Sequence, residues 1–250
     1  MGVVQGLTEF LPVSSSGHLA LARRLLHAGL AQDLGMEIAV HAGTLVACLI
    51  YYRVRILKIF TQTFRNEEEG RKWLLWLVIA TIPAGVAGLL LKDKVPEMFN
   101  SMTRIGVGFL ITAVILFFSE RVAVGRITAG DMGFWRALVI GIGQAVAIEP
   151  SISRSGTTIG AALFTGVDKR SGTDFAFILS LPSVGGATLL IVKEWVEGNA
   201  AFGIPHTVGA LVAGVLGYLT IGFMIRVVAG GKLRWFALYC AAVGIVSFAL

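Results

Sequence analysis

Two serine-rich segments carry the residues of this chain that could do chemistry. The first runs from Gln5 to His18 and reads QGLTEFLPVSSSGH, and the second runs from Glu149 to Thr158 and reads EPSISRSGTT. Each combines hydroxyl groups, a proline, a glycine and ionisable side chains inside an otherwise apolar sequence. Loose backbone and charged side chains are tolerated at membrane depth only where they line a protected cavity. The two segments therefore predict a buried anion-binding site.

The first segment offers a carboxylate, an amide, hydroxyls and an imidazole. Gln5 and Glu9 are four residues apart and share one face of a helix, where they could hold a hydrated divalent cation or position a water molecule. Pro12 should stop that helix, and a second helix could open on the hydroxyl and N–H groups of Ser14, Ser15 and Ser16, with an N-terminus that attracts anions. His18 lies close to this turn and can pass a proton near neutral pH.

The second segment places a guanidinium at another expected helix start. Arg154 has a planar fork that fits phosphate oxygens. An arginine in the middle of a membrane costs about 2.5–3.5 kcal/mol on the lenient insertion scale, which favours a functional role for this residue. The groups around it are a flexible glycine and four hydroxyls, namely Gly156, Ser153, Ser155, Thr157 and Thr158.

Several candidates have a structural alternative. Small residues in membrane helices often serve close packing, which is an equally good interpretation of Ser16, Thr157 or Gly160 taken alone. Glu37 and His41 are four residues apart and form either an outer layer around Glu9 or a buried pair that serves helix packing. Glu149 is either the counter-ion of Arg154 or a second metal ligand. The sequence leaves each of these alternatives open.

The composition indicates a polytopic membrane protein. Hydrophobic residues make up 56% of the 250 residues and charged residues 14%, and the mean hydropathy is +0.80, which does not fit a soluble domain. The net charge of +6 arises from Lys and Arg in short loops rather than from one basic patch, so nucleic acid is not expected as a partner. Cys48 and Cys240 lie inside apolar runs and are interpreted as packing residues.

The order of apolar runs predicts an all-α fold with a twofold repeat. Six long runs predict membrane-spanning helices at 34–52, 73–91, 104–118, 173–192, 207–228 and 235–250. Four shorter pieces meet in pairs at the two segments and predict broken, re-entrant hairpins at 1–12 with 15–31 and at 134–148 with 157–167. We therefore expect one membrane domain over 1–250, in which a hairpin and three spans occur twice, over about 1–125 and about 126–250.

The second repeat should be inverted relative to the first. A hairpin returns to its own side and three spans are an odd number, so the two hairpins should reach one midplane site from opposite faces. The positive-inside rule agrees with this topology. Placing 53–72, 119–136, 168–172 and 226–234 inside collects fourteen of the 21 Lys and Arg, and the outer segments 13–33, 92–104 and 193–206 hold six, which leaves Arg154.

The two segments also carry a family resemblance. The chain resembles the bacterial undecaprenyl-diphosphatases, membrane enzymes linked to bacitracin resistance. Its residues from Gln5 to His18 are similar to the family's first signature, a glutamate or glutamine and then Gly-x-Thr-Glu-Phe-Leu-Pro-Val-Ser-Ser-x-Gly-His. Residues 150–158 are similar to Pro-Gly-x-Ser-Arg-Ser-Gly-x-Thr, with Ser151 in place of the glycine, and the stretches 175–182 and 185–187 resemble the span that follows.

This resemblance implies an activity, a cofactor and a location. The implied reaction removes the terminal phosphate from undecaprenyl diphosphate in the bacterial plasma (inner) membrane, which recycles the lipid carrier for cell-wall synthesis and confers bacitracin resistance. The implied cofactor is a divalent cation, Mg²⁺ or Ca²⁺. The implied partners are the lipid substrate and the membrane lipids, and a homodimer stays an open question.

The resemblance also implies residue roles. Glu9 would be a metal ligand or acid/base residue, with Gln5 as a weaker second ligand, and Arg154 would clamp the diphosphate. Ser15 is the candidate nucleophile with His18 as its base, while attack by His18 itself or by a metal-activated water stays open. The expected substrate-binding residues are Ser14, Ser16, Ser153, Ser155 and Thr158.

Three departures and one rival function accompany these expectations. Gln5 is a weaker ligand than the glutamate that many relatives carry, so the metal affinity or the acid/base division should differ. Ser151 limits positive φ values and Glu149 stands where an apolar residue is usual, so the surroundings of Arg154 should differ as well. The rival is a transporter that flips polyprenyl phosphate, because inverted repeats with broken helices also build transporters. A transporter needs no nucleophile and base, so the joint presence of Ser15 and His18 favours the enzyme. A purely structural subunit would leave Glu9 and Arg154 unexplained.

Overall fold

A computed structural model describes residues 1–25, 34–99, 101–122, 125–197 and 203–250. Within these ranges the chain is helical apart from turns and a bridge between Ile127 and Val167, which confirms the all-α expectation. The α-helices are α1 Gly2–Thr8, α2 Ser15–Leu25, α3 Leu34–Phe64, α4 Glu68–Leu91, α5 Val95–Met98, α6 Met102–Ser119, α7 Gly133–Val146, α8 Arg154–Phe164, α9 Lys169–Glu197, α10 Ile204–Ala229 and α11 Leu233–Ser247, and a 3-10 helix, η1, spans Ala129–Asp131.

Four helices of the described chain are long and apolar enough to cross a membrane. They are Gly35–Phe64 within α3, Glu68–Leu91, Met102–Ser119 and Ile204–Ala229. These helices agree with four of the six expected spans, while the runs 173–192 and 235–250 fall on α9 and α11. The expectation of a multi-pass membrane protein is supported to this extent. Residues 26–31 of the expected piece 15–31 lie outside the described residues.

The loop expected at 53–72 is wrong in extent, because most of it is helix. α3 continues to Phe64 and α4 begins at Glu68, which leaves only residues 65–67 between them. Asn66 reverses the chain there with a left-handed φ of +62°. Residues 53–64 contain no proline or glycine, so the helix continues past the end of the apolar run. Hydropathy thus marks the end of the apolar run and not the end of the helix.

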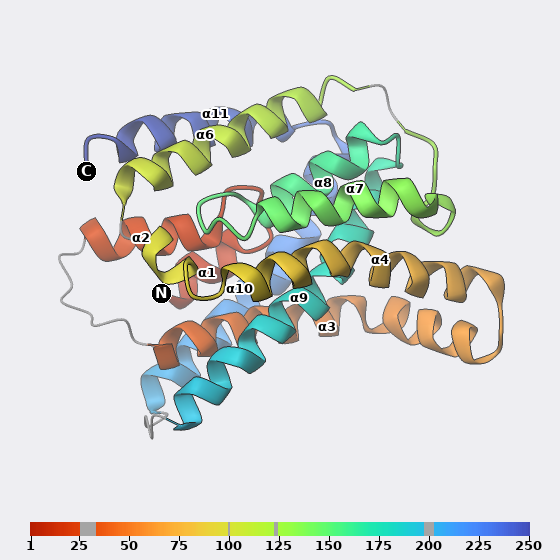
Figure 1. Cartoon of the computed structure of the whole chain (residues 1–250), viewed down its shortest axis with the longest axis horizontal. Coiled ribbons are helices and arrows are strands. Elements are labelled where there is room, and N and C mark those ends of the chain that lie inside the picture. Colours follow the sequence, from red (N-terminus) through yellow and green to blue (C-terminus); the bar gives the residue numbers. More distant parts are fainter. Residues whose placement is uncertain (26–33, 100, 123–124, 198–202) are drawn as a thin grey trace.

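Long helices pack in pairs that are distant in sequence. α3 lies along α10, α4 lies along α7, and α6 lies along α11 at the top of Figure 1. The α6–α11 contact uses small residues: a Cβ added to Gly106 would lie 2.8 Å from the Gly244 carbonyl oxygen, and one added to Gly244 would lie 2.9 Å from the Gly106 oxygen. Such close approach is the usual way in which helices associate in lipid. Gly160 follows the packing alternative as well, since its Cβ would lie 2.8 Å from Ile115.

The two serine-rich segments form the turns of two helical hairpins, as expected. α1 and α2 are joined by residues 9–14, and α7 and α8 by residues 147–153. Both second helices start on a serine: the Gly17 N–H donates to Ser14 Oγ (3.2 Å), and the Gly156 N–H donates to Ser153 Oγ (3.1 Å). A serine that accepts from the third residue of the following helix is the usual N-cap. α1 ends at Thr8, before Pro12, so the first turn is longer than the sequence predicts.

Candidate active site

The tips of the two hairpins meet through reciprocal hydrogen bonds. Ser14 Oγ donates to the Pro150 carbonyl oxygen (2.7 Å), and Ser155 Oγ donates to the Leu11 carbonyl oxygen (2.8 Å). Ser14 holds a left-handed φ of +64°, which is uncommon for a residue with a Cβ and is sustained here by bonds on both sides of its hydroxyl. Both segments therefore contribute to one buried site, as their composition indicates.

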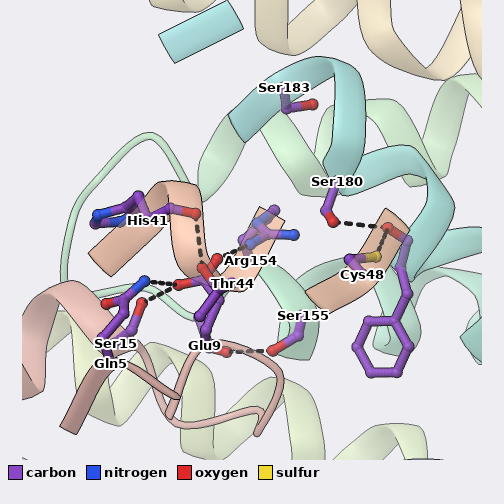
Figure 2. Close-up of polar contacts among 12 residues, drawn as sticks. Gln5, Glu9, Ser15, His41, Thr44, Cys48, Arg154, Ser155, Ser180 and Ser183 are labelled. Carbon is purple, nitrogen blue, oxygen red and sulfur yellow. Dashed lines mark hydrogen bonds and ion pairs between the residues drawn. The ribbon is translucent and has the colours of Figure 1, made fainter. Parts of the chain in front are cut away.

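Glu9 is the centre of this site. Its Oε2 accepts hydrogen bonds from Gln5 Nε2 (2.8 Å) and from Ser15 Oγ (2.6 Å), and its Oε1 forms an ion pair with Arg154. Figure 2 shows these three side chains directed at the carboxylate from three parts of the chain. The Glu9 side chain is only 5% exposed. A buried carboxylate is tolerated when its oxygens are paired and hydrogen-bonded, which is the case here.

His18 lies near the site but does not contact Ser15. Its Nδ1 is 2.7 Å from the Ser14 carbonyl oxygen, and its Nε2 is 2.7 Å from the Tyr239 hydroxyl. Because a carbonyl oxygen only accepts, Nδ1 carries the proton of the neutral ring and Nε2 accepts from Tyr239. The ring stacks on Tyr239 and meets the edge of Phe109. The pairing of Ser15 with His18 is therefore not formed, and Ser15 is paired with Glu9 instead.

The remaining hydroxyl candidates mainly hold the second hairpin together. Ser153 caps α8, its N–H donates to Thr112 Oγ1 (3.0 Å), and its Oγ is 3.2 Å from Ser155 Oγ. Thr158 Oγ1 donates to the Arg154 carbonyl oxygen within α8 (2.7 Å). Ser16 is half-buried on α2. Ser153 and Ser155 thus lie at the junction of the two tips, while the Thr158 hydroxyl serves its own helix.

The oxygen atoms of Gln5 and Glu9 fit a divalent cation whose other ligands would come from water or substrate. Gln5 is fully buried, and its amide oxygen has no hydrogen-bond partner although the nitrogen bonds to Glu9. An unpaired buried oxygen next to a carboxylate is a suitable ligand for Mg²⁺ or Ca²⁺. Within the described part of the chain, no group of three or more His, Cys, Asp or Glu could enclose a metal ion. Gln5 and Glu9 would therefore hold it together with other oxygen donors.

Three acidic or basic candidates pair away from Glu9. Glu37 forms an ion pair with Arg23 (3.1 Å), and His41 Nδ1 is 2.9 Å from the Glu37 carbonyl oxygen. This arrangement favours the packing alternative over an outer layer around Glu9. Glu149 pairs with Arg104 at 2.7 Å, so the interpretation of Glu149 as the counter-ion of Arg154 is wrong. Arg154 takes Glu9 as its partner because the tip contacts bring the two hairpins together.

A narrow crevice beside Glu9 is lined by residues that sequence reasoning missed. Its walls include Phe10 and residues of α3 and α9, namely Thr44, Leu45, Cys48, Ser180 and Val184. Cys48 Sγ and Ser180 Oγ both donate to the Phe177 carbonyl oxygen, as Figure 2 shows. Pro182 is the sequence signal that could have pointed to this region, because a proline inside a helix removes a backbone hydrogen bond, here in α9 close to Ser180.

The fold and the site define the class of this protein: a helical, multi-pass membrane protein in which two hairpins meet around a buried carboxylate and guanidinium. The family model described as "Bacitracin resistance protein BacA" matches residues 1–246, and the chain belongs to this family. The family resemblance of the two signatures is thereby confirmed.

Curated relatives cover the full chain. The undecaprenyl-diphosphatase of Syntrophotalea carbinolica is 40% identical over 253 residues, which span 100% of this chain and 96% of the relative. The undecaprenyl-diphosphatase of Carboxydothermus hydrogenoformans is 40% identical over 255 residues, with 100% and 95% covered. That of Methanosphaera stadtmanae is 36% identical over 266 residues, also with 100% and 95% covered.

Proposed function

We propose that this protein is a membrane phosphatase that hydrolyses undecaprenyl diphosphate to undecaprenyl phosphate and inorganic phosphate. The family and the names of the full-length relatives support this activity. The observation that carries it is Glu9, whose carboxylate accepts from the Ser15 hydroxyl and pairs with Arg154. The buried carboxylate is therefore in contact with a hydroxyl that can act as nucleophile, for which it can act as base, and with a guanidinium that can bind phosphate.

Both helix starts favour a diphosphate at this point. α2 begins at Ser15 and α8 begins at Arg154, and their N-terminal N–H groups carry partial positive charge. Arg154 adds a full charge and a planar fork. When the diphosphate binds, Arg154 exchanges its ion pair with Glu9 for phosphate oxygens, and the freed carboxylate can accept the Ser15 proton.

In the proposed reaction Glu9 takes the Ser15 proton as Ser15 Oγ attacks the terminal phosphorus. The bond from this phosphorus to the bridging oxygen breaks, and the leaving undecaprenyl phosphate takes the proton from Glu9. Glu9 then removes a proton from a water molecule that attacks the phosphoserine, and this proton returns to Ser15 as phosphate departs. Arg154 stabilises the charge on the transferred phosphoryl group in both steps. Direct attack by water is the alternative route, with Ser15 only orienting the substrate.

We also propose that Gln5 and Glu9 hold a divalent cation, Mg²⁺ or Ca²⁺, during the reaction. The unpaired amide oxygen of Gln5 supports this assignment. A bound cation supplies charge neutralisation for the diphosphate oxygens. His18 has a positioning role in this scheme, because its ring fixes the Ser14 carbonyl that precedes Ser15.

The inverted twofold repeat belongs to this proposal. It is supported by the matched caps Ser14 and Ser153, and by packing in which α1 lies on α10 as α7 lies on α4. The repeats cover about 1–125 and about 126–250 of one membrane domain. In the plasma membrane of a bacterium this activity would return the carrier lipid to cell-wall synthesis and confer resistance to bacitracin.

The test is phosphate release from undecaprenyl diphosphate by the purified protein in detergent, with and without Mg²⁺ or Ca²⁺. We expect cation-dependent turnover that is lost in Glu9→Ala and Arg154→Ala. Lys72→Ala is the matched control, since Lys72 pairs with Glu68 on the exposed start of α4. A well-folded protein that binds the lipid without releasing phosphate would contradict the proposal and favour the flippase.

A further inference from the structure

An ion pair joins α6 to the turn between α7 and α8. Arg104 Nε and one terminal nitrogen donate to Glu149 Oε2 at 2.9 and 2.7 Å. The Arg104 side chain is 47% exposed, whereas that of Glu149 is 19% exposed. Glu149 Oε1 is buried without a hydrogen-bond partner, so Arg104 is the partner that holds this carboxylate in place.

The same face of α6 holds this turn at two further points. Arg104, Gly108 and Thr112 follow one another at intervals of four residues and so lie on one face of α6. The Arg104 carbonyl oxygen accepts from Ser151 Oγ (3.4 Å), and Thr112 Oγ1 accepts from the Ser153 N–H (3.0 Å). Gly108 leaves room for Ser151, because a Cβ at this glycine would lie 2.6 Å from the Ser151 Cβ.

The turn leads directly into the residues that meet Glu9. Ser153 caps α8, and Arg154, the next residue, forms the ion pair with Glu9. The contacts along α6 fix the position and direction of the start of α8, and therefore the position of the Arg154 guanidinium. Near an active site a displacement of about 1 Å can reduce the rate by about 100-fold.

We propose that Arg104 and Glu149 are positioning residues, whose ion pair clamps the α7–α8 turn so that Arg154 faces Glu9 and the diphosphate. This inference rests on the proposed phosphatase function. Ser151, which stands where the family signature has glycine, also contacts Arg104 through its hydroxyl.

The test is a charge exchange across the clamp. Arg104→Glu and Glu149→Arg should each lower kcat about tenfold and raise KM by less than about threefold, because the displaced Arg154 would both stabilise the transferred phosphoryl group less and bind the diphosphate less well. The double variant should recover to within about threefold of the original kcat. If a reversal fails to fold, Arg104→Gln and Glu149→Gln replace it, and the double glutamine variant should then be no less active than the less active single variant. The matched control exchanges Glu68 and Lys72, an ion pair on the start of α4, and should leave both constants unchanged.

Hydrogen exchange of the backbone N–H groups in 149–156 gives a readout that does not depend on turnover. We expect faster exchange in both single variants and recovery in the double variant. If the original protein shows no turnover, the proposed function fails, yet this exchange pattern still tests the clamp. A higher KM without recovery in the double variant would overturn the inference, since Arg104 would then act on the substrate directly. An unchanged kcat with only a lower melting temperature would overturn it as well.

Discussion

At the scale of single residues, the site depends on which partners bind each of the two oxygens of one buried carboxylate. Glu9 gives one oxygen to Gln5 and Ser15 and the other to Arg154. The charge of Glu9 is compensated only while these partners remain, because an unpaired charge inside a membrane protein is strongly unfavourable. In the proposed mechanism, a diphosphate that captures Arg154 would therefore leave one Glu9 oxygen free while the other still accepts from Ser15.

The first prediction at this scale concerns the nucleophile. Ser15→Ala should lower kcat by at least about 100-fold and leave the fold intact, because Ser15 donates one hydrogen bond and is otherwise a small buried residue. Mass spectrometry after rapid acid quenching should find a phosphoryl group on Ser15 of the unaltered protein and none in the variant. Activity within about tenfold of the original would show that water attacks the phosphorus directly.

The second prediction concerns the cation ligands. Gln5→Glu should lower the magnesium concentration at half-maximal activity, since a carboxylate replaces the unpaired amide oxygen beside Glu9. Gln5→Leu, which removes that oxygen and keeps a similar volume, should raise it. The measurement is a magnesium titration of phosphate release at fixed substrate. If the three proteins share one midpoint, Gln5 is not a ligand.

At the scale of helices, the two hairpins begin their second helices in the same way. Ser14 and Ser153 each accept from a glycine N–H in the first turn of the helix that follows. The residues next to these caps, Ser15 and Arg154, are the two that reach Glu9 from α2 and α8. The caps thus orient the two side chains that pair with Glu9, as well as completing the helices.

We expect Ser153→Ala to destabilise the protein by about 1 kcal/mol, the usual loss for an N-cap, and to lower activity by more than this loss explains. The reason is that the cap also orients Arg154. Thr165→Ala is the control at the other end of α8, where the hydroxyl donates to the Ala161 carbonyl oxygen. Melting temperature and phosphate release are to be measured for both. Equal effects of the two substitutions on activity would contradict this role of the cap.

The sequence predicts the local parts of this architecture better than the long-range parts. Proline followed by serine and glycine marks the two helix starts, and composition identifies a membrane protein, because these signals lie within a few neighbouring residues. The partner of Glu149 could not be found in this way, because Arg104 is distant in sequence and the sequence alone does not distinguish it from the other Lys and Arg side chains. The end of α3 was missed because a helix can continue past its apolar run.

At the scale of the whole molecule, one helix pair supports both hairpin tips. α6 holds the second tip through Thr112 and Ser153, and α11 meets the first through Tyr239, which contacts His18. Cys240 Sγ adds a weak, long contact to the Pro12 carbonyl oxygen, at 3.6 Å. Because α6 and α11 pack against each other, we expect their separation to affect the distance between the two tips.

This arrangement predicts a large effect from a single methyl group at Gly244. The added Cβ would lie 2.9 Å from the Gly106 carbonyl oxygen and 3.1 Å from Leu110, so Gly244→Ala must push α6 and α11 apart. Overpacking of this kind costs about 1–3 kcal/mol, and the tips should separate enough to reduce kcat. Gly85→Ala is the same substitution on α4 at a position with nothing within 4 Å, and it should leave melting temperature and kcat unchanged. A Gly244→Ala protein that melts earlier but keeps its full kcat would mean that the tips hold their own spacing through Ser14 and Ser155, independently of the helices behind them.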